Sequence, residues 1–460
     1  MKTFGFLLRL GSSLVGLSAV LAAGSPVRAD TLGTSLPPFP AWIDPSDAVS
    51  PIALVQGGGI KVGEGTVLQP QVGLQTGVVS NVFYQNTNAV TAGLLRLLIE
   101  IGTGSLPIQR LNPAVADDGT TPPAPGSPTP VLESGDFQYS ANAYLSWDQY
   151  LSTNDNVTAQ GGLGGGLVLR GLVNPQRPLQ FAAQEVYSRL IRPVNFESQA
   201  DANRDINNVS LRLNYVPTGR SLSGYLYYQN TIDVFESSNQ QFANRMLNQF
   251  GVHLDWAWLP LTVVSADLSG GYNTGIGSSE KVTSTPLTAT AGIGTALTLS
   301  TTISAHIGYA NGFYASGPSY SSVQGGVLFG YRYSPLGRVT AQYDYSQYDS
   351  INANFYSEHL VALTLEQYFA SFILFARPEL RLRSYQGTIV MDVNGSTTRD
   401  DTIVAVTVGM RYNFRGWLAA TLDYNLQDDQ TDFRYTVGRF ANLDPSYIRH
   451  ELMLGVRAAY

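Results

Sequence analysis

The sequence predicts an all-β protein, a closed antiparallel β-barrel that crosses a membrane. Three observations predict it. From Val67 onward, segments of roughly 10–15 residues alternate apolar and polar side chains, which is the period of a two-faced strand. Aromatic residues gather near the ends of the apolar faces, and the connections between segments alternate between short and long.

We count eighteen such segments, with sixteen as the alternative count. An even number is the rule for bacterial outer-membrane barrels. The predicted strands begin near Val67, Val90, Asp136, Asn156, Leu179, Ile206, Ser221, Asn244, Leu261, Leu287, Thr301, Ser321, Arg338, Phe355, Ser371, Thr402, Trp417 and Tyr447.

The faces of these segments favour a membrane barrel over a soluble β-sandwich. In "TIVAVTVGMRYNF", Val404, Val406 and Val408 alternate with small or polar residues, and Tyr412 and Phe414 end the apolar face. Other segments carry charges at the centre of the polar face. Soluble strands usually have about 5–6 residues, whereas a strand that crosses a bilayer needs about 9–11. Only a closed barrel lets such strands span lipid without unpaired backbone groups.

The connections support the strand count independently. If the first strand starts in the periplasm, connections after even-numbered strands should be short, and later in the chain they are. One connection breaks the rule, because the Pro-rich stretch 103–135 follows the second strand. We expect it in the periplasm, where it is either a disordered linker or a docking arm for a partner; an error in the assumed phase of the strands is the other alternative. The short connections are 216–220, 259–260, 299–300, 333–337, 368–370 and 415–416; the longer ones include 190–203, 235–243, 274–286, 384–400 and 428–446.

The N-terminal region predicts export from the cytoplasm. Residues 1–29 carry Lys2 and Arg9, then an apolar run, and end in small residues, as a secretory signal peptide does. Residues 30–66 are rich in Pro and Gly and predict an extended periplasmic segment. The barrel is expected over 67–460, in the outer membrane of a Gram-negative bacterium.

Composition excludes several classes of protein. There is no cysteine, which rules out disulfides and thiolate metal sites. The formal net charge is −7 and no basic run indicates nucleic acid. The four histidines are scattered over separate segments without metal-ligand spacing. "GGLGGGLVLRG" (161–171) lacks the strand–turn–helix context of a phosphate-binding loop, so its glycines are expected to relieve crowding. We therefore expect no enzyme and no cofactor.

The polar faces carry the candidate functional residues. We expect ten charged side chains to line a pore, either as a salt-bridged wall or as a selectivity surface. Mixed signs argue against a strong preference for either class of ion. Tyr144, Tyr225 and Tyr227 could offer stacking faces to sugars, and Pro378 predicts a bulge or kink in its strand. The pore-lining candidates are Arg332, Asp344, Arg377, Glu379, Arg381, Arg383, Arg411, Arg449, Glu451 and Arg457.

The first predicted strand and loop, "LQPQVGLQTGVVSNVFYQNTN", resemble the opening of the β-barrel porin type 2 family, with "SNVFY" the most distinctive part. The resemblance covers most of the mature chain in pattern. It implies an outer-membrane barrel, and for some members a role in exopolysaccharide secretion beside a periplasmic export protein. It carries over no catalytic residue.

Two transport functions follow as expectations. The first is the outer-membrane conduit of an exopolysaccharide secretion system that acts with a periplasmic export protein. The second is a passive porin for small hydrophilic solutes, and an outer-membrane enzyme or an adhesin is a remote alternative. The expected partners are outer-membrane lipid, the barrel assembly machinery, and polysaccharide or a small solute.

The last segment, "IRHELMLGVRAAY", is expected to close the barrel. A closed barrel has no free edge, so residues 448–460 should pair with the strand that starts near Val67. Tyr460 would then lie at the periplasmic interface, where an amphipathic ring is favoured.

Overall fold

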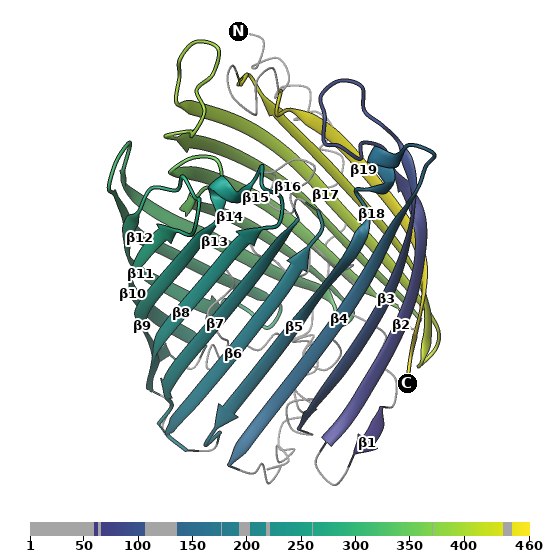
Figure 1. The fold of residues 1–460 in the computed structure, drawn as a ribbon. Coiled ribbons are helices and arrows are strands. Elements are labelled where there is room, and N and C mark those ends of the chain that lie inside the picture. The colour runs from purple at the N-terminus through teal and green to yellow at the C-terminus, as the bar shows by residue number, and fades with distance from the viewer. Residues whose placement is uncertain are drawn as a thin grey trace.

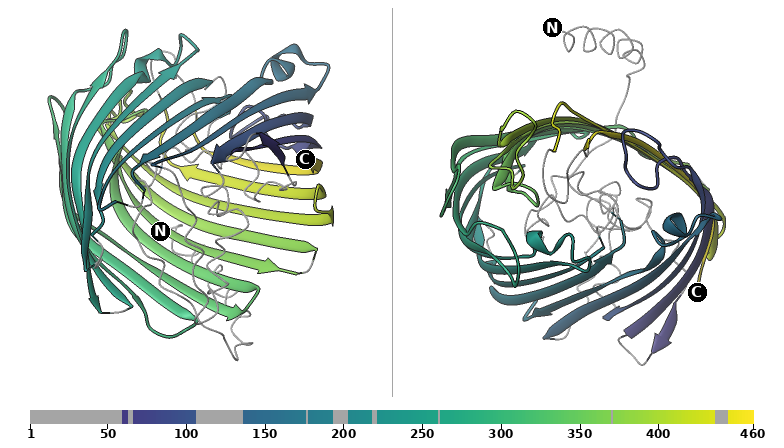
Figure 2. Two further views of the ribbon diagram at one scale, coloured as in Figure 1. Left: turned by 90° about the horizontal axis from the view of Figure 1, so that it is seen from below. Right: turned by 45° about the horizontal axis from the view of Figure 1, so that its top comes forward.

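The computed structural model describes residues 59–62, 66–105, 136–175, 177–192, 203–217, 221–259, 261–369, 371–435 and 444–460. Its strands form one antiparallel sheet, in which each strand pairs with its neighbours along the chain. Because β2 also pairs with β19, the eighteen strands β2 to β19 close into a barrel, as predicted (Figure 1). The views in Figure 2 show this closed ring from below and obliquely from above.

The strands are long and uniform. Their bounds are β1 (Ile60–Val62), β2 (Thr66–Val79), β3 (Ala92–Ser105), β4 (Phe137–Leu151), β5 (Gly162–Val173), β6 (Leu179–Leu190), β7 (Arg204–Tyr215), β8 (Leu222–Phe235), β9 (Arg245–Leu259), β10 (Thr262–Gly275), β11 (Ser284–Ala296), β12 (Thr301–Tyr314), β13 (Tyr320–Ser334), β14 (Gly337–Asp349), β15 (Phe355–Tyr368), β16 (Phe372–Gln386), β17 (Thr398–Arg415), β18 (Leu418–Thr431) and β19 (Tyr447–Ala459).

Within the described ranges, two short helical turns interrupt this pattern, α3 (Asp155–Thr158) and η3 (Gln241–Ala243). The strand predicted to begin near Asn156 therefore begins later, at Gly162. The Asn154 side chain accepts a hydrogen bond from the Asn156 backbone N–H and caps the helical turn, which the strand pattern alone did not reveal. Among the described residues, no helix is long and apolar enough to cross a membrane.

The closing seam joins the two ends of the described chain. β19 pairs with β2 from Glu451↔Val79 to Ala459↔Gln71. At the N-terminal end of β2, β1 takes the place of β19 and pairs with β2 from Ile60↔Leu68 to Val62↔Thr66. The Tyr460 N–H donates to the Pro70 carbonyl at 3.1 Å, and the Gly59 N–H donates to the Tyr460 carbonyl at 2.9 Å. The seam is therefore hydrogen-bonded along nearly all of β2.

The two rims of the barrel differ. Among the connections that are described throughout, those at the short-turn rim are 297–300, 335–336 and 416–417. Those at the long-loop rim include 80–91, 152–161, 236–244, 276–283 and 387–397. β3 ends and β4 begins at the short-turn rim, so the predicted insertion 103–135 starts and ends there. Its residues 106–135 lie outside the described residues, as do 1–58.

The outer face is apolar and exposed, as a lipid-facing surface must be. In β19, Leu452, Leu454 and Val456 are about half exposed, while Met453 and Arg457 between them are almost completely buried. The same alternation is clear in β3, β6 and β7. Trp256, Trp258, Tyr412 and Phe414 lie on the outer face near the short-turn rim, where an aromatic girdle is expected.

Pro378 does not produce the predicted bulge. β16 keeps one register with β17 on both sides of Pro378↔Val406, and pairing with β15 is interrupted only between Ala362↔Glu379 and Leu365↔Ala376. The exposed proline ring points outward, and the missing N–H costs a local gap in the ladder without inserting a residue. The neighbouring arginines therefore keep the inward phase that the sequence predicts.

The glycines of β5 make room for a tyrosine. A Cβ at Gly166 would lie 2.5 Å from the Tyr144 ring, so the ring covers the backbone of the next strand. Gly251 and Tyr227 repeat this arrangement between β9 and β8. The glycines relieve crowding at these two positions, as predicted for the motif.

The seam gives the first testable prediction. A Cβ at Gly77 would lie 1.9 Å from the Leu452 carbonyl oxygen of β19, whereas one at Gly102 would meet nothing nearer than 3.9 Å. We expect Gly77→Ala to destabilise the barrel by about 1–3 kcal/mol, the usual cost of overpacking. Gly102→Ala should have little effect. The measurement is the temperature at which the folded band disappears from unboiled electrophoresis samples, and equal temperatures for both variants would contradict the expectation.

Candidate functional site

The inner face of the barrel carries all ten charged residues selected from the sequence. Six of them, Arg332, Arg383, Arg411, Arg449, Glu451 and Arg457, are at most 7% exposed. Arg377, Asp344, Arg381 and Glu379 retain side-chain exposures of 33, 19, 14 and 13%. The ten residues therefore form a buried group, which is part of the wall, and a smaller group that water reaches.

A ladder of alternating charges runs along β15 and β16. We call Arg377, Glu379, Arg381, Glu358 and Arg383 the charge ladder. The Glu379 carboxylate forms ion pairs with Arg377 Nε and Arg381 Nη2, each at 2.5 Å. The Glu358 carboxylate forms ion pairs with Arg381 Nη1 at 3.2 Å and with Arg383 Nε at 2.5 Å. Each carboxylate thus bridges two guanidinium groups, and the spacing of two residues along a strand keeps all of them on the inner face.

Further ion pairs extend the ladder toward both rims. Arg338 forms a two-bond ion pair with Glu366 near the short-turn rim, at 2.7 and 2.9 Å. Arg399 contacts Asp401 at 2.6 Å and Asp429 at 3.7 Å near the long-loop rim. These ion pairs between β14 and β18 join five arginines and five carboxylates: Arg338, Arg377, Arg381, Arg383 and Arg399 with Glu358, Glu366, Glu379, Asp401 and Asp429.

A second cluster reaches across the long-loop rim. We call Arg192, Arg96, Asp148, Arg449 and Glu451 the Arg192 clamp. Glu451 of β19 accepts from Arg192 at 2.9 Å, from Arg96 at 3.3 Å and from Arg449 at 2.7 Å. Asp148 of β4 binds Arg96 through two hydrogen bonds and lies 3.7 Å from Arg192. Three cations therefore share two carboxylates.

Arg192 gives this clamp its span. It lies just after β6, and four strands of the barrel (β2 to β5) separate β6 from β19. Burial acts to lower the pKa of Arg192, but the carboxylates of Glu451 and Asp148 raise it by more, so the net shift in pKa is upward. The guanidinium therefore stays charged and ties the start of the β6–β7 connection to β4 and β19.

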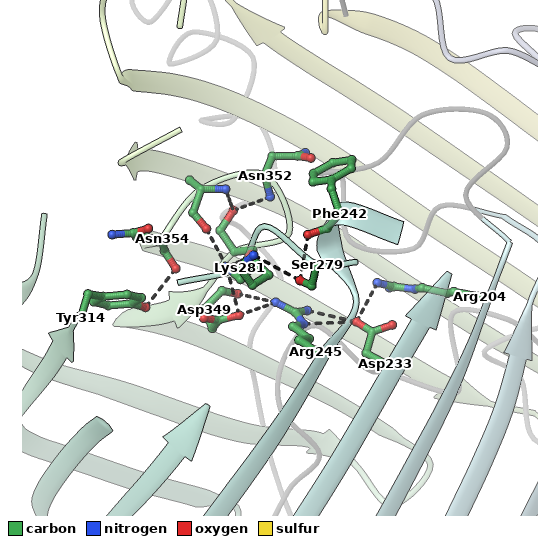
Figure 3. Close-up of polar contacts among 12 residues, drawn as sticks. Arg204, Asp233, Phe242, Arg245, Ser279, Lys281, Tyr314, Asp349, Asn352 and Asn354 are labelled. Atoms are coloured by element: carbon green, nitrogen blue, oxygen red, sulfur yellow. Dashed lines mark hydrogen bonds and ion pairs between the residues drawn. The ribbon is translucent and has the colours of Figure 1, made fainter. Parts of the chain in front are cut away.

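A third cluster spans the barrel between β9 and β14 (Figure 3). We call Arg245, Asp233, Asp349, Lys281 and Arg204 the Arg245 clamp. Arg245 forms ion pairs with Asp233 at 3.2 Å and with Asp349 at 2.5 Å. Asp233 also pairs with Arg204, at 3.4 Å. Lys281 lies 3.5 Å from Asp349. Four strands, β10 to β13, separate β9 from β14 along the wall.

Loops pack against the Arg245 clamp and fix it in place. The Lys281 ammonium donates to the carbonyls of Ser350 and Ala353, at 2.5 and 2.7 Å. Beside it, Phe235, Phe242, Ala243 and Ile351 form a buried apolar cluster from three different segments at the long-loop rim. The β8–β9, β10–β11 and β14–β15 connections are therefore joined to one another rather than extended into solvent.

Among the described residues, no group of three or more His, Asp or Glu side chains is placed to hold a metal ion. His253 lies between Asp255 and Asp267, at 3.1 and 3.5 Å, and His306 lies 3.4 Å from Asp344. His359 and His450 are on the outer face, each hydrogen-bonded to a tyrosine. These contacts are those of structural histidines.

The three lumen tyrosines selected as stacking faces have neighbours of their own. The Arg212 guanidinium lies 3.6 Å from the centre of the Tyr225 ring, and the His253 ring stacks on it at 4.8 Å. Tyr144 and Tyr227 cover glycines, as described above. Their rings pack against the wall, which does not favour the sugar-stacking interpretation.

Comparison with known proteins shows similarity in fold alone. No family model matches the chain and no curated protein matches it, so membership of the β-barrel porin type 2 family stays a prediction. Among solved structures, OccK2 (OpdF) of Pseudomonas aeruginosa in complex with glucuronate matches at 10% identity and a TM-score of 0.46, over 85% of this chain and 97% of that one. OccAB4 of Acinetobacter baumannii matches at 11% identity and a TM-score of 0.44, over 85% of this chain and 98% of that one. The FrpB iron transporter of Neisseria meningitidis matches at 10% identity and a TM-score of 0.44, over 87% of this chain and 82% of that one.

The charge ladder gives the second prediction. Glu358→Gln removes the carboxylate that bridges Arg381 and Arg383 in a buried site, and we expect a loss of about 3–5 kcal/mol. Glu366→Gln is the matched control, because its partner Arg338 is 43% exposed and an exposed pair contributes little, about 0–1 kcal/mol. Urea unfolding in lipid vesicles measures both, and a smaller loss for Glu358→Gln than for the control would contradict the expectation.

Proposed function

We propose that the protein is an outer-membrane channel for small hydrophilic solutes. The observation that carries this proposal is the closed eighteen-stranded barrel, apolar outside and charged inside from rim to rim. Barrels of 16–18 strands are wide enough for an aqueous channel. The predicted signal peptide over 1–29 supports export, and short turns at one rim with long loops at the other match outer-membrane barrels. The short-turn rim then faces the periplasm.

The charged residues divide into two roles in this proposal. The part-exposed Asp344, Arg377, Glu379 and Arg381 line the water-filled path, where paired charges solvate a polar solute without selecting strongly for one sign. The buried members, such as Arg383 and Glu451, stiffen the wall. The two interpretations left open by the sequence therefore apply to different residues of the set.

The two clamps favour small solutes over a polymer. The Arg192 clamp and the Arg245 clamp each span four intervening strands at the long-loop rim. Because each clamp ties residues near the mouth to strands further round the ring, we infer that it narrows the opening that a chain of sugars would have to pass. An exopolysaccharide conduit beside a periplasmic export protein is the alternative. It rests on the family resemblance and on the predicted extensions 30–66 and 103–135, most of which lie outside the described residues.

Conductance and deletion separate the two functions. Purified full-length protein in planar bilayers should give stable channels that pass salt and exclude long oligosaccharides. Deletion of the gene should leave surface polysaccharide unchanged and slow the uptake of small solutes. Loss of surface polysaccharide together with a closed barrel would contradict the channel and favour the conduit.

The Arg192 clamp gives the third prediction. Arg192→Gln removes the charge that ties the β6–β7 connection to Glu451, so the mouth should widen and single-channel conductance should rise, by roughly 1.5- to 2-fold. Arg189→Gln is the control, because Arg189 pairs with Glu236 near the same rim on the outer face. An unchanged conductance for Arg192→Gln, or an equal rise for the control, would show that the clamp does not limit the path.

The part-exposed end of the charge ladder gives the fourth prediction. Glu379→Gln leaves Arg377 and Arg381 without their shared carboxylate, so the path should become more selective for anions. Arg377→Gln should shift selectivity in the opposite direction. The reversal potential across a salt gradient measures both shifts, and shifts of the same sign would contradict a path along this ladder.

A further inference from the structure

The inner wall holds a buried arginine that the rest of the charge network leaves unpaired. Arg457 of β19 is 2% exposed. Within the described part of the chain it forms no ion pair, and none of its three guanidinium nitrogens has a hydrogen-bond partner. A buried charge without a partner is costly, so a group in this position calls for a ligand.

The backbone of the seam directs this side chain. Arg457 lies opposite Gly73 of β2, and a Cβ at Gly73 would lie 3.2 Å from Arg457 Cγ. The absence of a side chain at position 73 lets the arginine stem cross β2 toward β3. There the guanidinium borders a pocket, which we call the Arg457 pocket, whose lining includes Gln71, Gly73, Leu98, Glu100 and Tyr144 together with the apolar Val72 and Ile99.

The carboxylate in this pocket is already engaged elsewhere. Glu100 accepts a hydrogen bond from the Asn142 side chain at 2.6 Å and makes no ion pair with Arg457 within 4.0 Å. Gln71 leaves its side-chain oxygen without a partner. Because an amide can turn by 180°, Gln71 can present its NH2 group to an oxyanion beside Arg457.

We propose that the Arg457 pocket binds the carboxylate group of a small organic anion. A guanidinium presents paired N–H donors in a plane, and a carboxylate matches that geometry with two oxygens. The apolar side chain of Leu98 borders the same pocket and suits the carbon end of such a ligand. The pocket deepens the proposed function by naming a class of solute, yet binding can be measured without transport.

The experiment uses full-length protein in detergent and fluoroacetate as the probe. Fluorine NMR should show line broadening that unlabelled acetate reverses. Arg457→Gln should weaken binding by at least about tenfold, the scale of a lost charged hydrogen bond. Arg415→Gln should bind as the unchanged protein does, since exposed Arg415 at the same rim lies outside the pocket.

Two further variants keep the test decisive if Arg457→Gln fails to fold. Gly73→Ala should weaken binding because its Cβ displaces the Arg457 stem. Glu100→Gln should strengthen it by roughly two- to tenfold, because it removes a like charge near the ligand. Equal broadening in Arg457→Gln and Arg415→Gln would mean that the pocket holds only water and would overturn the proposal.

Competing anions define the ligand class. Inorganic phosphate should displace fluoroacetate less well than acetate does, and displacement as good or better would contradict the carboxylate assignment. Channel failure is distinguishable from pocket failure. If the protein binds fluoroacetate but gives no conductance, the proposed channel is contradicted and the pocket is supported. If it conducts but does not bind fluoroacetate, the pocket is contradicted and the channel is supported.

Discussion

The pairing of β2 with β19 is the interaction on which the whole structure depends. In lipid, an unpaired backbone N–H or C=O has no water to satisfy it, so a sheet that spans the membrane must have no edge. Closure by antiparallel neighbours returns both ends of the barrel to the same rim. The separation of short turns from long loops, and the strict division of each strand into an outer and an inner face, follow from that one constraint.

Closure also decides how the charges are held. Since the wall is a single layer, polar side chains excluded from lipid can find partners only inside the ring. Nearest partners give ladders along neighbouring strands, as Glu358 does with Arg381 and Arg383. More distant partners give clamps, as Glu451 does with Arg192. Ladders stiffen the wall, whereas clamps fix the shape of the mouth.

The sequence predicted the barrel, its strand number and the inward face of every selected charge, because a period of two residues is local and repeats eighteen times. It did not predict the partners. Arg192 and Arg245 were not among the predicted residues, because their contacts with Glu451 and Asp349 join segments with four strands between them, whereas alternation indicates only which face a residue occupies. The helical turn at Asp155 and the unbroken register at Pro378 were missed because capping and neighbouring strands override a single residue's preference.

The short strand β1 has a consequence for how the last strand finds its place. β1 and β19 lie end to end along β2, with Gly59 bonded to Tyr460 where they meet. β1 and β2 are close in sequence and can pair before the ring closes. We expect β1 to act as a stop that keeps β19 from sliding further along β2. A slip of one residue would turn Arg449, Glu451 and Arg457 toward lipid, and this three-residue strand would then oppose such a slip in the final seam.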